Sequence, residues 1–266
     1  MPIGEHGLEG IGLEEIQETS IHIVDANWGT DGLRAMLAAL TTDFDEPDRR
    51  AIAQAELLAS RLHIRDMRSG DRPYVNHVLR VTIRIVHYYH VRNADVICAA
   101  LLHDSVEDHP RGFAYLFTPA EREMDERSAA LAVLGRVFGD RVATLIEAVT
   151  NPEFEAGLSL EERQEQYRIH VRESLEAEPW ARVIKLSDFT DNGAGIDWTV
   201  AADKRKKLAK KYAPLVPNLI DFAQRHDTPL DPEVEAEIVE KLNAAAKRFE
   251  RILRNDKNNG GGDGRG

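Results

Sequence analysis

Apolar residues occupy every position from Val96 to Leu102, and this run leads directly into the polar segment His103–Asp108. On an α-helix, such a run places apolar side chains on nearly every side, which predicts a helix that is buried all round. Asn93 is a suitable N-cap residue and Pro110 cannot continue a helix, so these two residues bound the element. We therefore predict a buried helix whose charged end emerges from the core of the protein.

Apolar residues recur at intervals of three or four along most of the remaining chain, which predicts further helices. We expect these helices at residues 31–40, 47–62, 75–89, 119–137, 142–149, 159–177, 181–192, 213–225 and 231–255. Thr118, Pro119 and Glu121 supply the N-cap, first helical residue and capping-box acid of the helix over 119–137. The alternating residues 21–24 fit a strand or an ordered arm, and residues 113–117 fit a short apolar loop. The predicted fold class is all-α.

The sequence contains no internal repeat and no clean linker, so we predict one main helical domain with flanking segments. Its expected limits are residues 46–225, preceded by an N-terminal extension over 1–45 to which no function is assigned. A C-terminal helix is expected over 226–254. Residues 255–266 are rich in Gly, Asn and Asp and are expected to form a disordered tail.

The charge of the chain narrows the classes of ligand. Lys and Arg number 34 against 46 Asp and Glu, which gives a formal net charge of −12. A chain this acidic is a poor candidate for binding nucleic acid or a membrane surface, so an anionic ligand would need a metal or a local basic patch. Cys98 is the single cysteine, which excludes an internal disulfide. Because no apolar run could span a bilayer and no signal-peptide pattern is present, we expect a cytoplasmic location.

Four side chains have the chemistry of metal ligands and stand at helix starts or after apolar runs. They are His77, His103, Asp104 and Asp188. Two imidazoles and two carboxylates suit a divalent ion such as Mn²⁺, Fe²⁺, Co²⁺ or Zn²⁺. Such an ion could polarise a phosphoryl oxygen and activate a bound water. The bland alternative for His77 alone is a packed histidine at a helix start.

Two acids follow the central pair on the same predicted helix. Glu107 lies one turn beyond His103, and Asp108 lies one turn beyond Asp104. There they could order or deprotonate a water, or protonate a leaving oxygen; alternatively, they form an ordinary solvated helix end. The other histidines lack matching partners in the sequence and are interpreted as structural or exposed: His63, His87, His90, His109, His170 and His226.

The order His, His-Asp, Asp resembles that of the HD superfamily of metal-dependent phosphohydrolases. Five segments in the same order are similar to motifs of its RelA/SpoT-type guanosine-tetraphosphate hydrolase domains. They are Arg68 with Arg72-Pro73-Tyr74-Val75-Asn76-His77, Ala100 to Asp108, Phe138-Gly139 with Val142 to Thr150, Lys185-Leu186-Ser187-Asp188 with Asn192, and Tyr212-Ala213-Pro214-Leu215. The resemblance covers roughly residues 50–220.

The resemblance implies an all-helical HD-domain bundle around a metal site, and it implies roles for individual residues. The implied metal ligands are His77, His103, Asp104 and Asp188, and the implied catalytic acids are Glu107 and Asp108. Arg68 would stack on the base, Asn192 would hydrogen-bond the nucleotide, and Arg205 or a neighbouring lysine would contact phosphate. The implied reaction is the Mn²⁺-dependent removal of the 3′-pyrophosphate of (p)ppGpp. The length leaves no room for a synthetase or regulatory domain, so a stand-alone hydrolase is expected.

The sequence departs from the family pattern beside Asp188. Phe189-Thr190-Asp191 replaces the usual Arg-Leu-His string, and the spacing after Arg68 is altered. A hydrolase acting on another nucleotide or phosphoester is therefore kept as a second hypothesis. A non-catalytic HD module that binds a nucleotide as a sensor is a third, although it would tolerate loss of the ligands or acids, and all six are present.

Overall fold

A computed structural model of the chain describes residues 13–68, 72–154, 157–194 and 202–259. Within these ranges the structure is helical apart from two short strands, which confirms the all-α fold class. The chain divides into two compact units, residues 1–150 and 151–266, which are described separately. The domain limits expected at residues 45 and 225 stay predictions.

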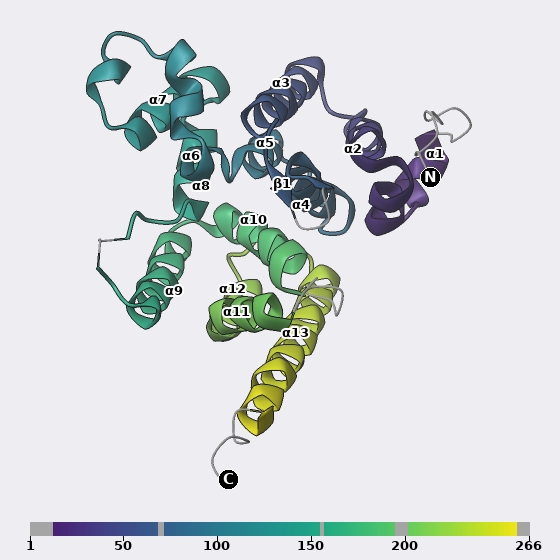
Figure 1. Ribbon diagram of the computed structural model, residues 1–266. Coiled ribbons are helices and arrows are strands. Elements are labelled where there is room, and N and C mark those ends of the chain that lie inside the picture. Colours follow the sequence, from purple (N-terminus) through teal and green to yellow (C-terminus); the bar gives the residue numbers. More distant parts are fainter. Residues whose placement is uncertain (1–12, 69–71, 155–156, 195–201, 260–266) are drawn as a thin grey trace, which may run out of the picture. The chain divides into compact units, whose positions relative to one another are not determined.

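The first unit is organised around the buried helix α5, which contacts α3, α4 and α8 (Figure 1). Its elements in chain order are α1 (Leu13–Glu18), α2 (Ile21–Leu40), α3 (Glu46–Leu62), β1 (Met67–Arg68), β2 (Arg72–Pro73), α4 (Val75–His87), α5 (Ala94–Leu102), α6 (Ser105–Asp108), the 3₁₀ helices η1 (Pro110–Leu116) and η2 (Glu121–Glu123), α7 (Glu126–Phe138) and α8 (Asp140–Val149). Every side chain from Val96 to Leu102 is at most 2% exposed. The predicted N-cap is also present, because the Val96 N–H donates to Asn93 Oδ1 over 3.2 Å.

The strand or arm expected over residues 21–24 is wrong, because this segment begins helix α2. Ile21 and Val24 are buried at helical spacing, whereas Ile23 between them is half exposed. Four alternating residues are too few to distinguish a strand from one turn of helix. The helix expected over 31–40 is thus the second half of a longer element, kinked at Gly29 with φ +56°.

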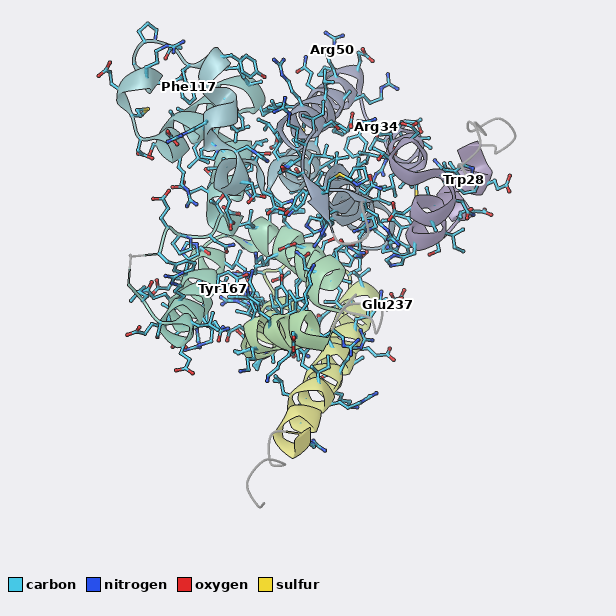
Figure 2. All side chains as sticks on the ribbon, in the orientation of Figure 1. Trp28, Arg34, Arg50, Phe117, Tyr167 and Glu237 are labelled. Atoms are coloured by element: carbon cyan, nitrogen blue, oxygen red, sulfur yellow. The ribbon has the colours of Figure 1, made fainter. Side chains whose placement is uncertain are left out.

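Helix α2 packs against α4, and polar contacts join it to both α4 and α3. Asp25 accepts hydrogen bonds of 2.7 Å from both Asn76 Nδ2 and Arg80 Nη1 on α4. Arg34, labelled in Figure 2, donates to Glu56 on α3 over 2.8 Å. Part of the segment expected to be an extension is therefore built into the first unit, next to the helix that carries His77.

The helix expected over 119–137 begins later than its capping box indicates. The reciprocal bonds of that box are formed: Thr118 N–H donates to Glu121 Oε2 over 2.6 Å, and Glu121 N–H donates to Thr118 Oγ1 over 3.3 Å. They enclose only the short helix η2, because Asp125 supplies a second N-cap. Its side chain accepts from the Ser128 N–H, and α7 starts directly after it at Glu126. The apolar loop expected over 113–117 is largely the 3₁₀ helix η1, with Phe113 fully buried.

The second unit is also helical. Its elements are α9 (Leu160–Glu176), α10 (Pro179–Phe189), the π-helical turn η3 (Thr190–Ala194), α11 (Ala202–Tyr212), the 3₁₀ helix η4 (Ala213–Leu215), α12 (Val216–Ala223) and α13 (Pro232–Asn259). Helices α11 and α12 both contact α13. Helix α13 continues to Asn259, within the range expected to be a tail, and residues 260–266 of that expectation lie outside the described residues.

Candidate metal centre

A two-stranded turn places His77 at the start of α4. Strands β1 and β2 pair antiparallel, with Met67 opposite Pro73, and the Tyr74 N–H donates to the Asp66 carbonyl over 2.9 Å. Helix α4 follows at once, so His77 stands in its first turn, as the sequence predicts. The side chain of His77 is fully buried.

The backbone fixes the orientation of His103 at the end of α5. Its Nδ1 lies 2.8 Å from the Ala100 carbonyl oxygen, which can only accept, so Nδ1 carries the proton and donates it. In the neutral tautomer that this bond selects, Nε2 on the other side of the ring is the nitrogen available to a metal. Backbone carbonyls orient metal-binding histidines in the same way, because the bond selects both the tautomer and the ring position.

Asp104 brings a carboxylate to both imidazoles. Its Oδ2 lies 3.1 Å from His103 Nε2 and 3.6 Å from His77 Nε2, and the ligand atoms of the two histidines lie within 4.8 Å of each other. Tyr74 donates its hydroxyl proton to the same oxygen over 2.7 Å. An imidazole nitrogen and a carboxylate oxygen 3.1 Å apart can share a proton or a metal cation. This His-Asp cluster could bind a metal ion.

The helix is interrupted at His103 and Asp104. Helix α5 ends at Leu102 and α6 begins at Ser105, yet the Asp108 N–H donates to the Asp104 carbonyl over 2.9 Å. This bond keeps Asp108 one turn beyond Asp104, as expected. The pKa of Asp108 is raised to about 6, first by burial of its carboxyl group and then by the negative charges of Asp104 and Glu107, although the residue as a whole still reaches solvent.

Asp188 and Asn192 lie in the second unit, at the end of α10. Asp188 is buried, and it accepts hydrogen bonds from Lys185 Nζ over 3.2 Å and from Asn192 Nδ2 over 2.6 Å. The sequence-based placement of Asn192 one turn beyond Asp188 on the same face is therefore correct. The π-helical turn that holds Asn192 is a local irregularity of a kind often found at functional sites.

The remaining predicted contacts are placed as follows. The guanidinium of Arg68 lies 5.5 Å from the centre of the Tyr74 ring, in the same unit as the His-Asp cluster. Arg205 lies half-buried on α11, within the basic run of that helix. Phe189 is a core residue, because its ring packs edge-on against Tyr212 and Phe249. The departure from the family pattern at this position thus contributes to the packing of the second unit.

Sequence reasoning missed two features of the first unit. One is Tyr74, whose hydroxyl contacts Asp104 across 30 positions of sequence. The other is a second group of ligand-type side chains, His63, Asp66 and His109, of which the two histidines were interpreted as lacking partners. His109 lies 43 positions beyond Asp66 in the chain, and no local sequence pattern connects it with His63 and Asp66.

Comparison with known proteins identifies one structure and several sequences that are similar to this chain. A solved structure titled "A metazoan ortholog of SpoT hydrolyzes ppGpp and plays a role in starvation responses" matches with a TM-score of 0.53 and 22% sequence identity, over 76% of this chain and 96% of that one. The chain has the fold of this ppGpp hydrolase. The predicted resemblance to (p)ppGpp hydrolase domains is confirmed.

Two curated sequences extend the similarity. A guanosine-3′,5′-bis(diphosphate) 3′-pyrophosphohydrolase of Aquifex aeolicus is 33% identical over 172 residues, and a Drosophila melanogaster protein of the same activity name is 30% identical over 122 residues. The matches cover 63% and 46% of this chain. The chain spans about a fifth of the Aquifex protein (21%) and about half of the Drosophila protein (55%). No protein-family model matches the sequence. None of the described helices is long and apolar enough to cross a membrane.

Proposed function

We propose that this protein is a divalent-metal-dependent hydrolase that removes the 3′-pyrophosphate of (p)ppGpp. The observation that carries the proposal is the convergence of His77, His103 and Asp104, with the His103 ring oriented by its bond from Nδ1 to the Ala100 carbonyl. The similarity to proteins that are named for this reaction supports the choice of substrate.

We propose Mn²⁺ as the ion, with Asp188 as a fourth ligand, as the order of the motifs implies. Two nitrogen and two oxygen donors suit Mn²⁺ and leave positions of an octahedral ion for water and a phosphate oxygen. A divalent ion supplies activation of a water and polarisation of the phosphoryl group. The protein orients both ligands: the Ala100 carbonyl accepts from His103 Nδ1, and the Tyr74 hydroxyl donates to Asp104 Oδ2.

Glu107 and Asp108 are proposed as the catalytic acids. A carboxyl group with a pKa of about 6, such as that of Asp108, can both accept and return a proton near neutral pH. Glu107 stands on the same short helix α6, where its carboxylate can orient the attacking water. Arg68, Asn192 and Arg205 are proposed to contact the base, the nucleotide and a phosphate, in that order.

Purified protein with Mn²⁺ should be assayed by HPLC against a panel of nucleotides that includes ppGpp. We expect release of pyrophosphate from ppGpp, loss of turnover with metal retained in Glu107→Gln and Asp108→Asn, and loss of both in His103→Gln. Glu123→Gln, an exposed residue of η2, is the matched control and should keep full activity. Unchanged turnover in both acid variants would remove the roles assigned to them.

A second candidate is a hydrolase of another nucleotide or phosphoester. It is favoured by Phe189-Thr190-Asp191, which replaces two polar or cationic groups of the family pattern with a core phenylalanine and an acid. The same panel separates the two, because full activity on other nucleotides and none on ppGpp would refute the first proposal. Binding of ppGpp without turnover of any nucleotide would instead favour a sensor module.

A further inference from the structure

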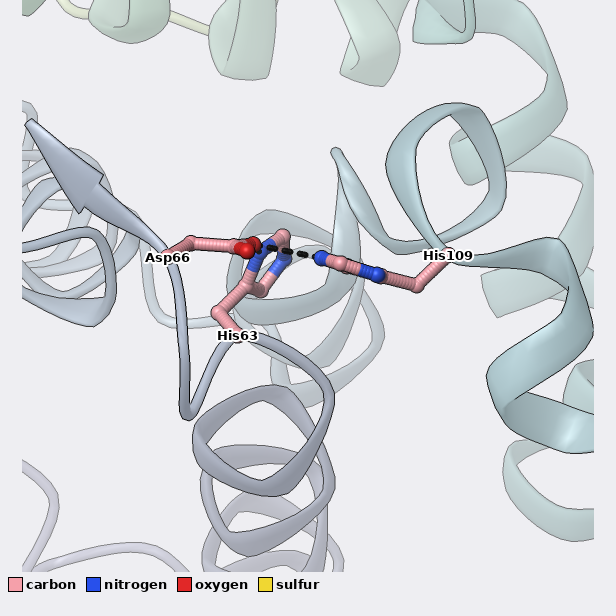
Figure 3. Close-up of side chains that lie close together, drawn as sticks. All are labelled: His63, Asp66 and His109. Carbon is pink, nitrogen blue, oxygen red and sulfur yellow. Dashed lines mark hydrogen bonds and ion pairs between the residues drawn. The ribbon is translucent and has the colours of Figure 1, made fainter.

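A second set of metal-ligating side chains lies in the first unit, separate from the residues assigned above. His63 ends helix α3, Asp66 lies in the turn before β1, and His109 follows α6; Figure 3 shows the three side chains converging. His63 Nδ1 lies 2.8 Å from Asp66 Oδ2, and His109 Nε2 lies 2.5 Å from the same oxygen. Two segments 43 residues apart in sequence, one carrying His63 and Asp66 and the other carrying His109, thus meet at one carboxylate oxygen.

The surroundings hold two of these side chains in place. The His63 ring is fully buried, stacked on Tyr74 with ring centres 4.8 Å apart and packed edge-on against His109 at 4.7 Å. The backbone around Asp66 is fixed by its N–H, which donates to the His63 carbonyl over 3.0 Å, and by its own carbonyl, which accepts from Tyr74. The His63 ring and the backbone at Asp66 are therefore in place before any ion arrives, which lowers the entropic cost of binding.

One side of the cluster is open to solvent. The side chains of Asp66 and His109 are 30% and 28% exposed, whereas His63 is closed off. An ion can therefore enter from the side of Asp66 and His109 and retain a water there. Three protein ligands with a solvent-facing fourth position is the arrangement of open zinc sites.

We propose that His63, Asp66 and His109 bind a divalent cation through Nδ1, Oδ2 and Nε2, with Zn²⁺ as the ion that this donor set favours. Two imidazole nitrogens and one carboxylate oxygen are common zinc ligands, and zinc binds such donors more tightly than Mn²⁺ does. In a tetrahedral site with bonds of about 2.0–2.1 Å, ligand atoms stand about 3.3–3.4 Å apart. The Asp66 carboxylate must therefore move away from the two histidine nitrogens by less than about 1 Å. The partial exposure of Asp66 leaves room for this movement.

This cation site is independent of the proposed hydrolase activity, although Tyr74 touches both clusters. The Tyr74 ring stacks on His63, and its hydroxyl donates to Asp104. The second ion would join the end of α3, the turn before β1 and the segment after α6. Because the two clusters are neighbours, an experiment must count the ions and assign each of them.

The test is metal stoichiometry in the full-length protein. Protein stripped with a chelator is titrated with Zn²⁺ by calorimetry, the bound metal is counted by mass spectrometry, and Co²⁺ is used as a spectroscopic probe of the ligands. We expect two ions per chain in the wild type and one in Asp66→Asn, in His109→Gln and in His103→Gln. His226→Gln, which changes an exposed histidine of the second unit, should still bind two.

The result that would overturn the proposal is a stoichiometry in Asp66→Asn and His109→Gln equal to that of the wild type. Thermal melting checks that each variant is folded. If Asp66→Asn does not fold, the test rests on His109→Gln, which changes a partly exposed side chain. If His103→Gln leaves the count unchanged while His109→Gln lowers it, the second site stands and the metal of the proposed hydrolase is refuted. The two proposals can therefore fail separately.

Discussion

Tyr74→Phe removes a single hydroxyl from the candidate metal centre and leaves the ring in place. The Tyr74 hydroxyl donates to Asp104 Oδ2 over 2.7 Å, and this oxygen also lies 3.1 Å from His103 Nε2. The ring stack on His63 and the contact with Arg68 involve the aromatic face, which phenylalanine retains. The substitution therefore tests how strongly Asp104 is held as a ligand.

The magnitude follows from the geometry of this bond. A short hydrogen bond from a hydroxyl to a carboxylate is charge-assisted, and such bonds contribute about 1.5–3 kcal/mol. Groups that orient a metal ligand typically change metal affinity or activity by about 10–100-fold when they are removed. At about 1.4 kcal/mol for each factor of ten, the two ranges agree. We expect Tyr74→Phe to weaken Mn²⁺ binding by about 10–100-fold, with the fold retained.

The assay is a calorimetric Mn²⁺ titration of Tyr74→Phe, made both in the wild-type sequence and in His109→Gln. The His109→Gln background is included so that an ion at the second cluster does not contribute to the measured affinity. Turnover of ppGpp at limiting Mn²⁺ should fall in parallel and recover at high Mn²⁺. Tyr115→Phe is the matched control, because the Tyr115 side chain is half exposed and its ring contacts Arg61 instead. A Mn²⁺ affinity of Tyr74→Phe within twofold of the wild type would refute the reasoning that Asp104 is positioned by this bond.

Three further predictions concern stability. Asp25→Ala should destabilise the first unit by about 3–5 kcal/mol in chemical denaturation, because it leaves the largely buried Arg80 without its carboxylate. Leu101→Ala should cost about 2–5 kcal/mol, because Leu101 is fully buried in α5 and its removal leaves a cavity. Hydrogen bonding to the buried Arg182 lowers the pKa of Asp227 to about 2, below its usual 3.8. This stabilisation is complete above pH 4 and is lost as the pH falls towards 2, so Asp227→Asn should flatten the acid limb of a thermal melting profile.

Each of these predictions has a result that contradicts it. An Asp25→Ala variant as stable as the wild type would mean that water replaces the carboxylate at Arg80. A loss below about 1 kcal/mol in Leu101→Ala would show that the core around α5 collapses into the space. An acid limb unchanged in Asp227→Asn would assign that part of the acid sensitivity to other carboxylates.

The buried helix and the position of His103 and Asp104 at its end could be predicted because their signals are local. The apolar run from Val96 to Leu102 specifies burial, Asn93 specifies the start of α5, and His103 follows directly. Asn192 was placed correctly beside Asp188 for the same reason, since one helical turn separates them.

The contacts that were missed join positions distant in sequence. Asp66 and His109 are 43 residues apart, and neither has a neighbour that distinguishes a ligand from an ordinary surface residue. The long helix α7 also starts from the second N-cap at Asp125 and not from the capping box at Thr118, although the hydrogen bonds of both caps are formed. Local sequence patterns indicate where a helix can start, whereas packing determines which of these starts continues into a long helix.

The contact of α2 with α4 bears on how the protein can be shortened. The residue before His77 in the chain is Asn76, and its amide is held by Asp25 from a helix that contains none of the recognised motifs. A fragment trimmed to begin at α3 would keep every motif, yet it would expose the face of α4 that α2 now covers. Expression boundaries chosen from the motifs alone would therefore discard the support of the first histidine.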